Sequence, residues 1–565
     1  MATADLMAPS MVTTFNACLR HGVFLPQWKE ARLVTVLKGG VRDRGCVSSY
    51  RPICLLSTVG KIFERLLRDR IMECVEISPQ QYGFTKERCT SDAIERVYAL
   101  VRSSRCKLAI IITVDVVSAF NSLWWPHIMA CLRTGGCPGD VYAVIQDYFK
   151  NRSVTLLDGP ASRTISQERG CPQGSVLGPT LWNVAFDGLL GELARCKGVS
   201  PVAYADDLTM VVEGDTTEII QERAQMAMDL AYRWCEERKM KISAEKTYCL
   251  EAKGMFRGNP PRIQGESGQQ LQFVETVKFL GVHSDRRLRV QSHCINIAEK
   301  AKATFQGFRR IAKANWGIRF GQLALLYKAI FIPTITYAAG AWAGRATRAG
   351  LAKLVTAQRA ALMTVTRAYC TISTPALLVI ADATPIEFDL QKERLRHAIR
   401  RGETIRLDGN VYNPAQADAE QLWDALESAQ QQLWQHLWTH DTRGRATYEF
   451  FPSIAERREA SWVEPTYYVT QFLSGHGNFR SKLRKFNLVK NNKCQCGLED
   501  TPLHTFFGCS KYLDLREQLR AQVESTGARW PITWADSVSK DIMPFMAKYV
   551  TSVLKRKEQW DKERR

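Results

Sequence analysis

The chain has 565 residues, 45% of them hydrophobic, so it can build large cores in about three to four domains and is not a disordered protein. With 77 Lys and Arg against 57 Asp and Glu, the net charge of +20 indicates a polyanionic partner bound through phosphate contacts. The 17 cysteines follow no disulfide spacing, and neither a signal peptide nor an apolar run of ~20 residues stands out, which argues against a secreted or membrane-spanning protein.

The N-terminal part, Met1–Lys107, mixes predicted helix and short strand. Within it, Val59–Val75 has apolar residues at helical spacing and predicts an amphipathic helix. The next segment, Lys107–Val114, is a nearly continuous apolar and β-branched run. This run predicts a buried strand that delivers Asp115 to the edge of a sheet.

The tetrapeptide Tyr204–Asp207 lies between two short apolar runs, Pro201–Ala203 and Leu208–Val212, which predicts a hairpin with Asp206 and Asp207 at its tip. Two adjacent carboxylates repel each other unless a cation neutralises them. Together with Asp115 they would make an all-oxygen site, which suits Mg²⁺. Two such ions ~4 Å apart stabilise the attacking and leaving oxygens of a phosphoryl transfer, which is polymerase chemistry. The alternative is three aspartates that only cap turns.

Downstream, Ile219–Met240 predicts a long helix behind the sheet, and Gly254–Gly268 predicts a loop. Cys294–Arg319 is a basic helical stretch that would contact phosphates, or else form a solvated face. Ala346–Thr466 is helical and charged without a readable chemical motif, and Asp408–Ala419 predicts a linker loop.

A cluster of three thiols and one imidazole follows near the C-terminus. It comprises Cys494, Cys496, His504 and Cys509. This is a normal tetrahedral set for structural Zn²⁺, with no position left open for catalysis. The alternative is four coincidental residues in a loop.

The segment before this cluster, Asn478–Lys493, has no acidic residue and carries Phe479 and Phe486 among its cations. Basic charge with interleaved rings predicts binding of single-stranded RNA or of target DNA, whereas the alternative is a solvated basic helix. The predicted nucleic-acid-binding residues are Arg480, Lys482, Arg484, Lys485, Lys490 and Lys493.

Six blocks, in order between Gln27 and Trp342, resemble the reverse transcriptases of non-LTR retrotransposons. The blocks are Ser49–Leu56, Gln81–Phe84, Asp115–Asn121, Gly170–Ser175 with Leu177–Pro179, Tyr204–Asp207 and Phe279–Gly281. The Cys/His cluster resembles the zinc knuckle of arthropod type-1 elements that insert into ribosomal RNA genes. Relatives carry an endonuclease domain upstream of this region, so we expect the chain to be an N-terminally truncated fragment of such a Pol-type polyprotein.

The resemblance implies an α+β right-hand polymerase followed by a mainly helical C-terminal region with a small zinc knuckle. Fingers and palm would occupy 1–285, the thumb 286–345, and a helical connection region of unknown role 346–475. The basic segment with the knuckle would occupy 476–515, and a basic tail 516–565.

The resemblance also assigns roles to single residues. Asp115 and Asp206 would bridge two Mg²⁺ ions, for which Mn²⁺ could substitute, while Asp207 would be a weaker ligand and Lys246 would protonate the leaving pyrophosphate. Phe120 would exclude a ribose 2′-OH and so select deoxynucleotides. The other nucleotide-binding residues would be Arg51, Lys61, Gln173 and Gly174, and the primer grip would be Phe279, Leu280 and Gly281.

The function implied is RNA-directed DNA polymerisation from dNTPs, with element RNA as template and the 3′-OH of nicked target DNA as primer. We expect it to take place in the nucleus, without a membrane. Two alternatives stay open. One is the endonuclease activity of the parent polyprotein, for which we find no carboxylate set after Cys509, and the other is a catalytically decayed copy that still binds nucleic acid.

Overall fold

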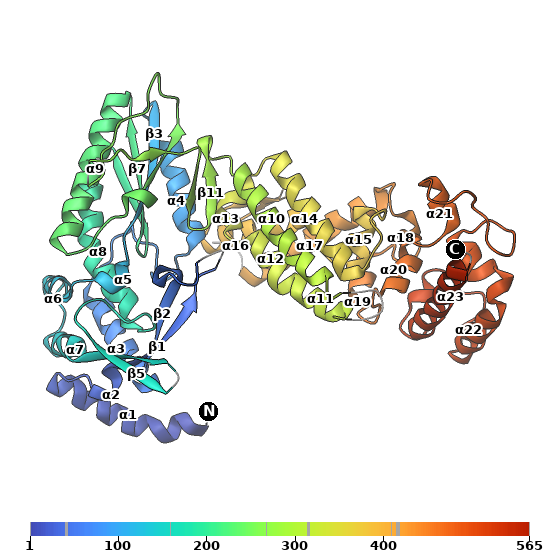
Figure 1. The fold of residues 1–565 in the computed structure, drawn as a ribbon, viewed down its shortest axis with the longest axis horizontal. Helices are drawn as coiled ribbons and strands as arrows, with labels where there is room; N and C mark the ends of the chain where they lie inside the picture. Colours follow the sequence, from blue (N-terminus) through green and yellow to red (C-terminus); the bar gives the residue numbers. More distant parts are fainter. Residues whose placement is uncertain are drawn as a thin grey trace. The chain divides into compact units, whose positions relative to one another are not determined.

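The computed structural model describes residues 2–39, 43–158, 160–266, 268–312, 317–407, 410–413 and 419–563. The chain forms two compact units, an N-terminal unit, Met1–Arg289, and a C-terminal unit, Val290–Arg565 (Figure 1).

A five-stranded sheet in the order β6-β7-β3-β8-β9 is the centre of the N-terminal unit. Its strands are β3 (Leu108–Asp115), β6 (Val199–Tyr204), β7 (Asp207–Gly214), β8 (Tyr248–Lys253) and β9 (Gln272–Phe273). β3 pairs antiparallel with β7 on one side and with β8 on the other. Both the predicted buried strand and the predicted hairpin are confirmed.

Helices cover both faces of this sheet. α8 (Leu177–Arg195) and α9 (Thr217–Glu237) pack against β6 and β7, and α4 (Thr90–Ser103) lies on the opposite side (Figure 1). Side chains alternate between the faces of a strand, yet Ile110, Ile111 and Ile112 are all buried. Burial on both faces explains why β3 is an unbroken apolar run rather than an alternating one.

A second, four-stranded sheet has the order β2-β1-β4-β5. Its strands are β1 (Glu30–Leu37), β2 (Tyr50–Leu55), β4 (Arg152–Asp158) and β5 (Ala161–Gln167). β1 pairs parallel with β4, so half of this sheet comes from beyond Lys107. The surrounding helices are α1 (Ala2–His21), α2 (Pro26–Lys29), α3 (Thr58–Cys74), α5 (Ala119–Ser122), α6 (Trp125–Thr134) and α7 (Gly139–Phe149). α3 confirms the predicted amphipathic helix.

A short hairpin completes the N-terminal unit. It joins β10 (Thr276–Phe279) to β11 (Val282–Asp285) through Leu280 and Gly281. Both turn residues have positive φ, 46° and 83°, as a two-residue turn of type I′ requires.

The described residues of the C-terminal unit form helices and one pair of strands, β12 (Ile405–Leu407) and β13 (Asn410–Tyr412). α10 (Gln291–Arg309) packs along α14 (Arg348–Thr366). The helix predicted over Cys294–Arg319 ends at Arg309 in the structure. Residues 313–316 lie outside the described part. The other helices are α11 (Phe320–Leu326), α12 (Ile332–Thr336), α13 (Ala339–Trp342), α15 (Thr374–Ala381), α16 (Ile386–Arg400), α17 (Ala419–His440), α18 (Arg445–Tyr448), α19 (Ile454–Glu459), α20 (Tyr467–Ser474), α21 (Arg480–Lys485), α22 (Leu513–Ser525) and α23 (Met543–Glu563).

Two segments differ from their description in the sequence analysis. The predicted linker loop Asp408–Ala419 contains strand β13, and its residues 408–409 and 414–418 lie outside the described part. The basic tail 516–565 consists largely of α22 and α23, which pack against each other, and α23 also packs on α20.

Within the described ranges no single helix is long and apolar enough to cross a membrane. One bent pair of helical segments, Phe320–Thr336 and Ala339–Arg345, is long and apolar enough when the two are taken together, by length and composition alone.

Candidate functional site

The register of the central sheet brings the three predicted carboxylates to one end of neighbouring strands. Asp115 closes β3 directly opposite Asp207, the first residue of β7. Asp206 lies beside Ala205 in the two-residue turn between β6 and β7. The hairpin and the central strand therefore present all three carboxylates to the same region.

Little positive charge lies close to the three carboxylates of this site. Burial raises the pKa of Asp206, and the negative charge of Asp115 raises it further. Burial and the neighbouring charges of Asp206 and Asp115 raise the pKa of Asp207 to about 6. The Nζ of Lys246 lies 3.4 Å from Asp115 Oδ2, but this lysine side chain is 68% exposed. Oxygen donors that repel one another fit a divalent cation such as Mg²⁺.

Asp207→Asn should stabilise the metal-free protein at pH 8 and leave its stability unchanged at pH 4. The raised pKa means that ionised Asp207 costs folding free energy, a cost that grows from about pH 4 to about pH 6 and is complete above it. Asparagine removes this cost, so we expect Tm to rise by about 1–3 °C at pH 8. Thermal unfolding of both proteins in chelator at each pH measures it, and an equal shift at both pH values would contradict the assignment.

The turn that carries Asp206 is held by a residue to which the sequence analysis assigned no role. Buried Gln81 accepts hydrogen bonds from the backbone N–H of Ala205 and of Gly83, both at 2.9 Å, and donates to the Ala205 carbonyl at 3.2 Å. Ala205 has a φ of 56°, so this amide fixes a left-handed residue beside Asp206. A Cβ at Gly83 would overlap the backbone of Ala205, so only glycine fits there.

A cavity of about 320 Å³ connects Asp115 and Asp207 to the predicted primer grip. Its wall includes Asp115, Asp207, Lys246, Phe279 and Leu280. Gly281 completes the turn of the β10–β11 hairpin. These predicted catalytic and primer-binding residues therefore border one space.

The predicted nucleotide-binding residues lie on adjoining elements. The carbonyl of Gln173 accepts a hydrogen bond from Cys54 N at 2.7 Å, and Gly174, with φ of 133°, leaves no room for a Cβ against the Cys54 carbonyl. Cys54 belongs to β2, the strand that also carries exposed Arg51. Lys61 lies in the first turn of α3, which follows β2 in the chain.

The ring of Phe120 is half-buried in an aromatic cluster. It packs edge-on against Phe84, with centroids 6.1 Å apart, and lies 5.4 Å from the ring of Trp182. The cluster joins Phe84 and Phe120, which belong to two of the sequence blocks, to Trp182 on α8, and these contacts hold the ring of Phe120.

A second residue that the sequence analysis missed is Glu64, buried on α3. It accepts hydrogen bonds from Ser175 Oγ at 2.8 Å, Val176 N at 2.5 Å and Leu177 N at 3.2 Å. These groups lie at the start of α8, where backbone N–H groups lack helical partners. A charged residue on the apolar face of Val59–Val75 was the available indication in the sequence.

The predicted zinc ligands converge in the C-terminal unit. Cys494 Sγ lies 3.7 Å from Cys509 Sγ, and Cys496 Sγ lies 3.1 Å from His504 Nε2. All four donor atoms lie within 4.8 Å of one another. The sulfur separation is too long for a disulfide and suits thiolates around one tetrahedral ion.

The basic segment is only partly available for binding. Phe479, predicted to stack on bases, is fully buried against the edge of Phe506, so that part of the prediction is wrong. Phe486 is 49% exposed. Arg480 and Lys482 are half-buried in α21, and Arg480 Nη2 lies 3.7 Å from Asp561 Oδ1. The exposed cations are Arg484, Lys485, Lys490 and Lys493.

Residues 36–284 match the family described as "Reverse transcriptase (RNA-dependent DNA polymerase)". The chain is 29% identical over 516 residues to a Pol polyprotein from the type-1 retrotransposable element R1 of Bradysia coprophila, covering 90% of this chain and 51% of that protein. It is 28% identical over 531 residues to a 115 kDa protein of element R1DM from Drosophila melanogaster, covering 92% and 51%. The chain therefore spans about half the length of these relatives.

Two further similarities cover less of the chain or show lower identity. The RNA-directed DNA polymerase from mobile element jockey of Drosophila melanogaster is 29% identical over 343 residues, covering 57% of this chain and 36% of that protein. Telomerase from Candida albicans in complex with the TWJ fragment of telomeric RNA is 12% identical at a TM-score of 0.37, covering 77% of this chain and 66% of that one.

Proposed function

The chain belongs to the reverse transcriptases of R1-type non-LTR retrotransposable elements, and on that premise we propose that it polymerises DNA on an RNA template at the Asp115, Asp206 and Asp207 site. One observation carries the location. β3 and β7 set Asp115 opposite Asp207, with Asp206 in the adjoining turn, so three mutually repelling carboxylates meet at one sheet end.

Asp115 and Asp206 would hold two Mg²⁺ ions, with Asp207 as the weaker ligand. When bound, the ions stabilise the attacking primer oxygen and the leaving pyrophosphate. Lys246, whose Nζ lies 3.4 Å from Asp115 Oδ2, would give a proton to the departing pyrophosphate. Phe279, Leu280 and Gly281 would hold the primer backbone across the same cavity.

The template would be element RNA and the primer the 3′-OH of target DNA, in the nucleus. Arg51, Lys61, Gln173 and Gly174 would bind the incoming dNTP from the adjoining sheet. These partners fit a chain with a net charge of +20.

Phe120→Val should relax discrimination against ribonucleotides. The Phe84 and Trp182 rings hold Phe120 in place, and a smaller side chain would leave room for a 2′-OH. We expect incorporation of a ribonucleotide relative to its deoxynucleotide to rise about 10- to 100-fold. Single-nucleotide incorporation measures this ratio. Phe256→Val, at a half-buried ring that packs on Phe273 and not on Phe120, is the control and should leave the ratio unchanged. An unchanged ratio in Phe120→Val would overturn the role of this ring.

Cys494, Cys496, His504 and Cys509 would bind one structural Zn²⁺. Cys496→Ser should lower the metal content from about one zinc per chain to near zero, because it removes one of the four protein ligands of the ion. Elemental analysis of the purified chain checks this. Cys370→Ser, at an exposed cysteine outside the cluster, should retain the zinc. Equal zinc in both variants would contradict the site.

Primer extension tests the proposed activity. The full chain is mixed with an RNA template annealed to a DNA primer, dNTPs and Mg²⁺. We expect DNA complementary to the template, and no product in EDTA. If RNA is bound but no primer is extended, the polymerase proposal is overturned.

A further inference from the structure

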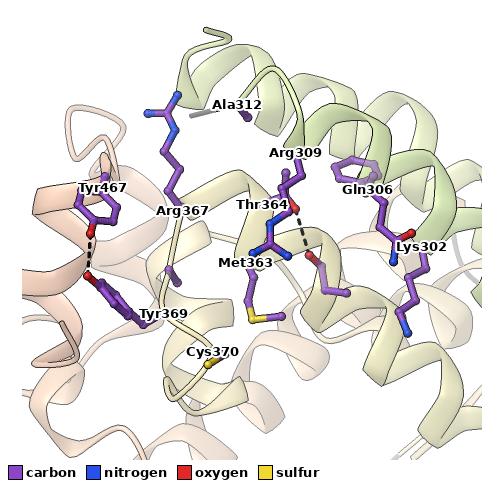
Figure 2. A pocket seen from close by; sticks show the side chains of 13 residues that line it. Lys302, Gln306, Arg309, Ala312, Met363, Thr364, Arg367, Tyr369, Cys370 and Tyr467 are labelled. Carbon is purple, nitrogen blue, oxygen red and sulfur yellow. Dashed lines mark hydrogen bonds between the residues drawn. The ribbon is translucent and has the colours of Figure 1, made fainter. Parts of the chain in front are cut away.

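A cavity of about 650 Å³ in the C-terminal unit lies between α10 and the C-terminal end of α14 (Figure 2). One wall is a stripe on α10, where Lys302, Gln306 and Arg309 recur at helical spacing. The opposite wall is the last turn of α14 and the residues after it, including Arg367 and Tyr369. Its volume lies within the ~300–1,000 Å³ of ligand-binding pockets.

The charge of this cavity is uncompensated. Of the described residues that line it, three are cationic and none is acidic. Neither Lys302 nor Arg309 has a hydrogen-bond or ion-pair partner among the described residues, and both are exposed. The stripe from Lys302 to Arg309 runs about 10 Å along the helix, enough to meet more than one phosphate of a strand.

Arg367 adds a buried donor on the opposite wall. Its Nη2 donates to the Ile318 carbonyl at 2.6 Å, whereas its Nε is buried without a hydrogen-bond partner. The residue also ends α14 in the left-handed region, with φ of 53°, where glycine is usual. Arg367 therefore brings to this wall a positive charge that has no acidic partner among the described residues.

Aromatic rings line one end of the cavity, beside its positively charged residues. Tyr369 and Tyr467 lie with ring centroids 5.9 Å apart and share a hydroxyl hydrogen bond of 2.6 Å at one end of the cavity (Figure 2). Phe305 and Met363 give the floor an apolar surface. A basic groove combined with aromatic side chains is how proteins bind single nucleic-acid strands, through phosphates and through the faces of unpaired bases.

We propose that this cavity binds unpaired nucleotides of a single nucleic-acid strand, with Lys302, Arg309 and Arg367 on its phosphates and Tyr369 against a base. All residues of this site belong to the C-terminal unit, whereas the carboxylates belong to the N-terminal unit. It rests on the proposed function only in that a polymerase of this family handles nucleic acid, and its binding needs no catalysis.

Cys370 makes the proposal testable, because it is exposed and lines the cavity. Alkylation of Cys370 by N-ethylmaleimide in the full chain is followed by peptide mass spectrometry. Short oligo(U) or oligo(dT) should slow the reaction, and exposed Cys46 of the N-terminal unit reports binding elsewhere. Protection by RNA alone or by DNA alone supports the proposal and identifies the strand.

Arg309→Ala should raise the oligonucleotide concentration needed for half-protection of Cys370 by about tenfold. Arg310→Ala removes the same charge from the next residue of the chain, which does not line the cavity, and should change it by less than about threefold. Three results would overturn the proposal: no protection by either oligonucleotide, equal midpoints in the two variants, or equal protection by a blunt duplex or by polyglutamate. Because alkylation is read without dNTPs, it stands or fails independently of primer extension.

Discussion

Asp206→Asn should lower the rate of nucleotide incorporation by about 10³-fold while the protein stays folded. Asparagine keeps the size of the side chain but removes the charge that would hold the metal. The turn itself should survive, since Gln81 binds the backbone of Ala205 and not the side chain of Asp206. Removing one of three repelling carboxylates also relieves electrostatic repulsion, so Tm should not fall.

The measurement is single-turnover incorporation of one dNTP at saturating Mg²⁺. Asp229→Asn is the matched control, because Asp229 is exposed on α9 and belongs neither to the β6–β7 turn nor to the end of β3. It should retain the native rate. If Asp206→Asn kept more than about a tenth of the native rate with a native-like Tm, Asp206 would not be a metal ligand.

Lys557→Met should destabilise the C-terminal unit by about 3–5 kcal/mol. Lys557 Nζ lies 2.5 Å from Asp500 Oδ1 and 2.6 Å from Oδ2, and the two side chains are 8% and 1% exposed. Asp500 also accepts hydrogen bonds from Thr505 Oγ1 and from the backbone N–H of Arg480. Removing the lysine leaves a buried carboxylate uncompensated between α23, the Cys/His cluster and the basic segment.

Urea unfolding of the full chain measures this loss, and the neighbouring Arg556→Ala is the control. Arg556 pairs with Asp514 at 2.7 Å, but these side chains are 32% and 55% exposed, so we expect a change of about 1 kcal/mol or less. The double variant Lys557→Met with Asp500→Leu should recover part of the loss, because no charge is then left buried. Equal losses for Lys557→Met and Arg556→Ala would contradict a buried ion pair.

Local patterns were sufficient to predict the strands that position the carboxylates. The apolar run before Asp115 is unbroken because β3 is buried on both faces, and the two short apolar runs on either side of Tyr204–Asp207 are the two strands of a tight hairpin. The Cys/His spacing likewise predicted residues that the structure brings together. In each case the informative residues lie close together in the sequence.

Contacts between distant residues could not be predicted in the same way. Gln81 contacts Ala205 across 124 positions, and Glu64 contacts Ser175 across 111, so neither partner was evident from periodicity. The second sheet pairs β1 with β4, a pairing between strands far apart in the chain. Phe479 lies among cations in the sequence, but Phe506 and Lys557 bury it, and only tertiary structure reveals that.

The most direct test of the central claim, that Asp115, Asp206 and Asp207 together hold the divalent ions of a polymerase site, is cleavage of the chain by bound Fe²⁺ in ascorbate and peroxide. Radicals formed at the ion cut the backbone nearby, and mass spectrometry locates the cuts. We predict cuts beside Asp115 and beside Asp206–Asp207, suppressed by excess Mg²⁺ and absent in Asp206→Asn. Cuts elsewhere only, or cuts at these positions that persist in Asp206→Asn, would contradict the account.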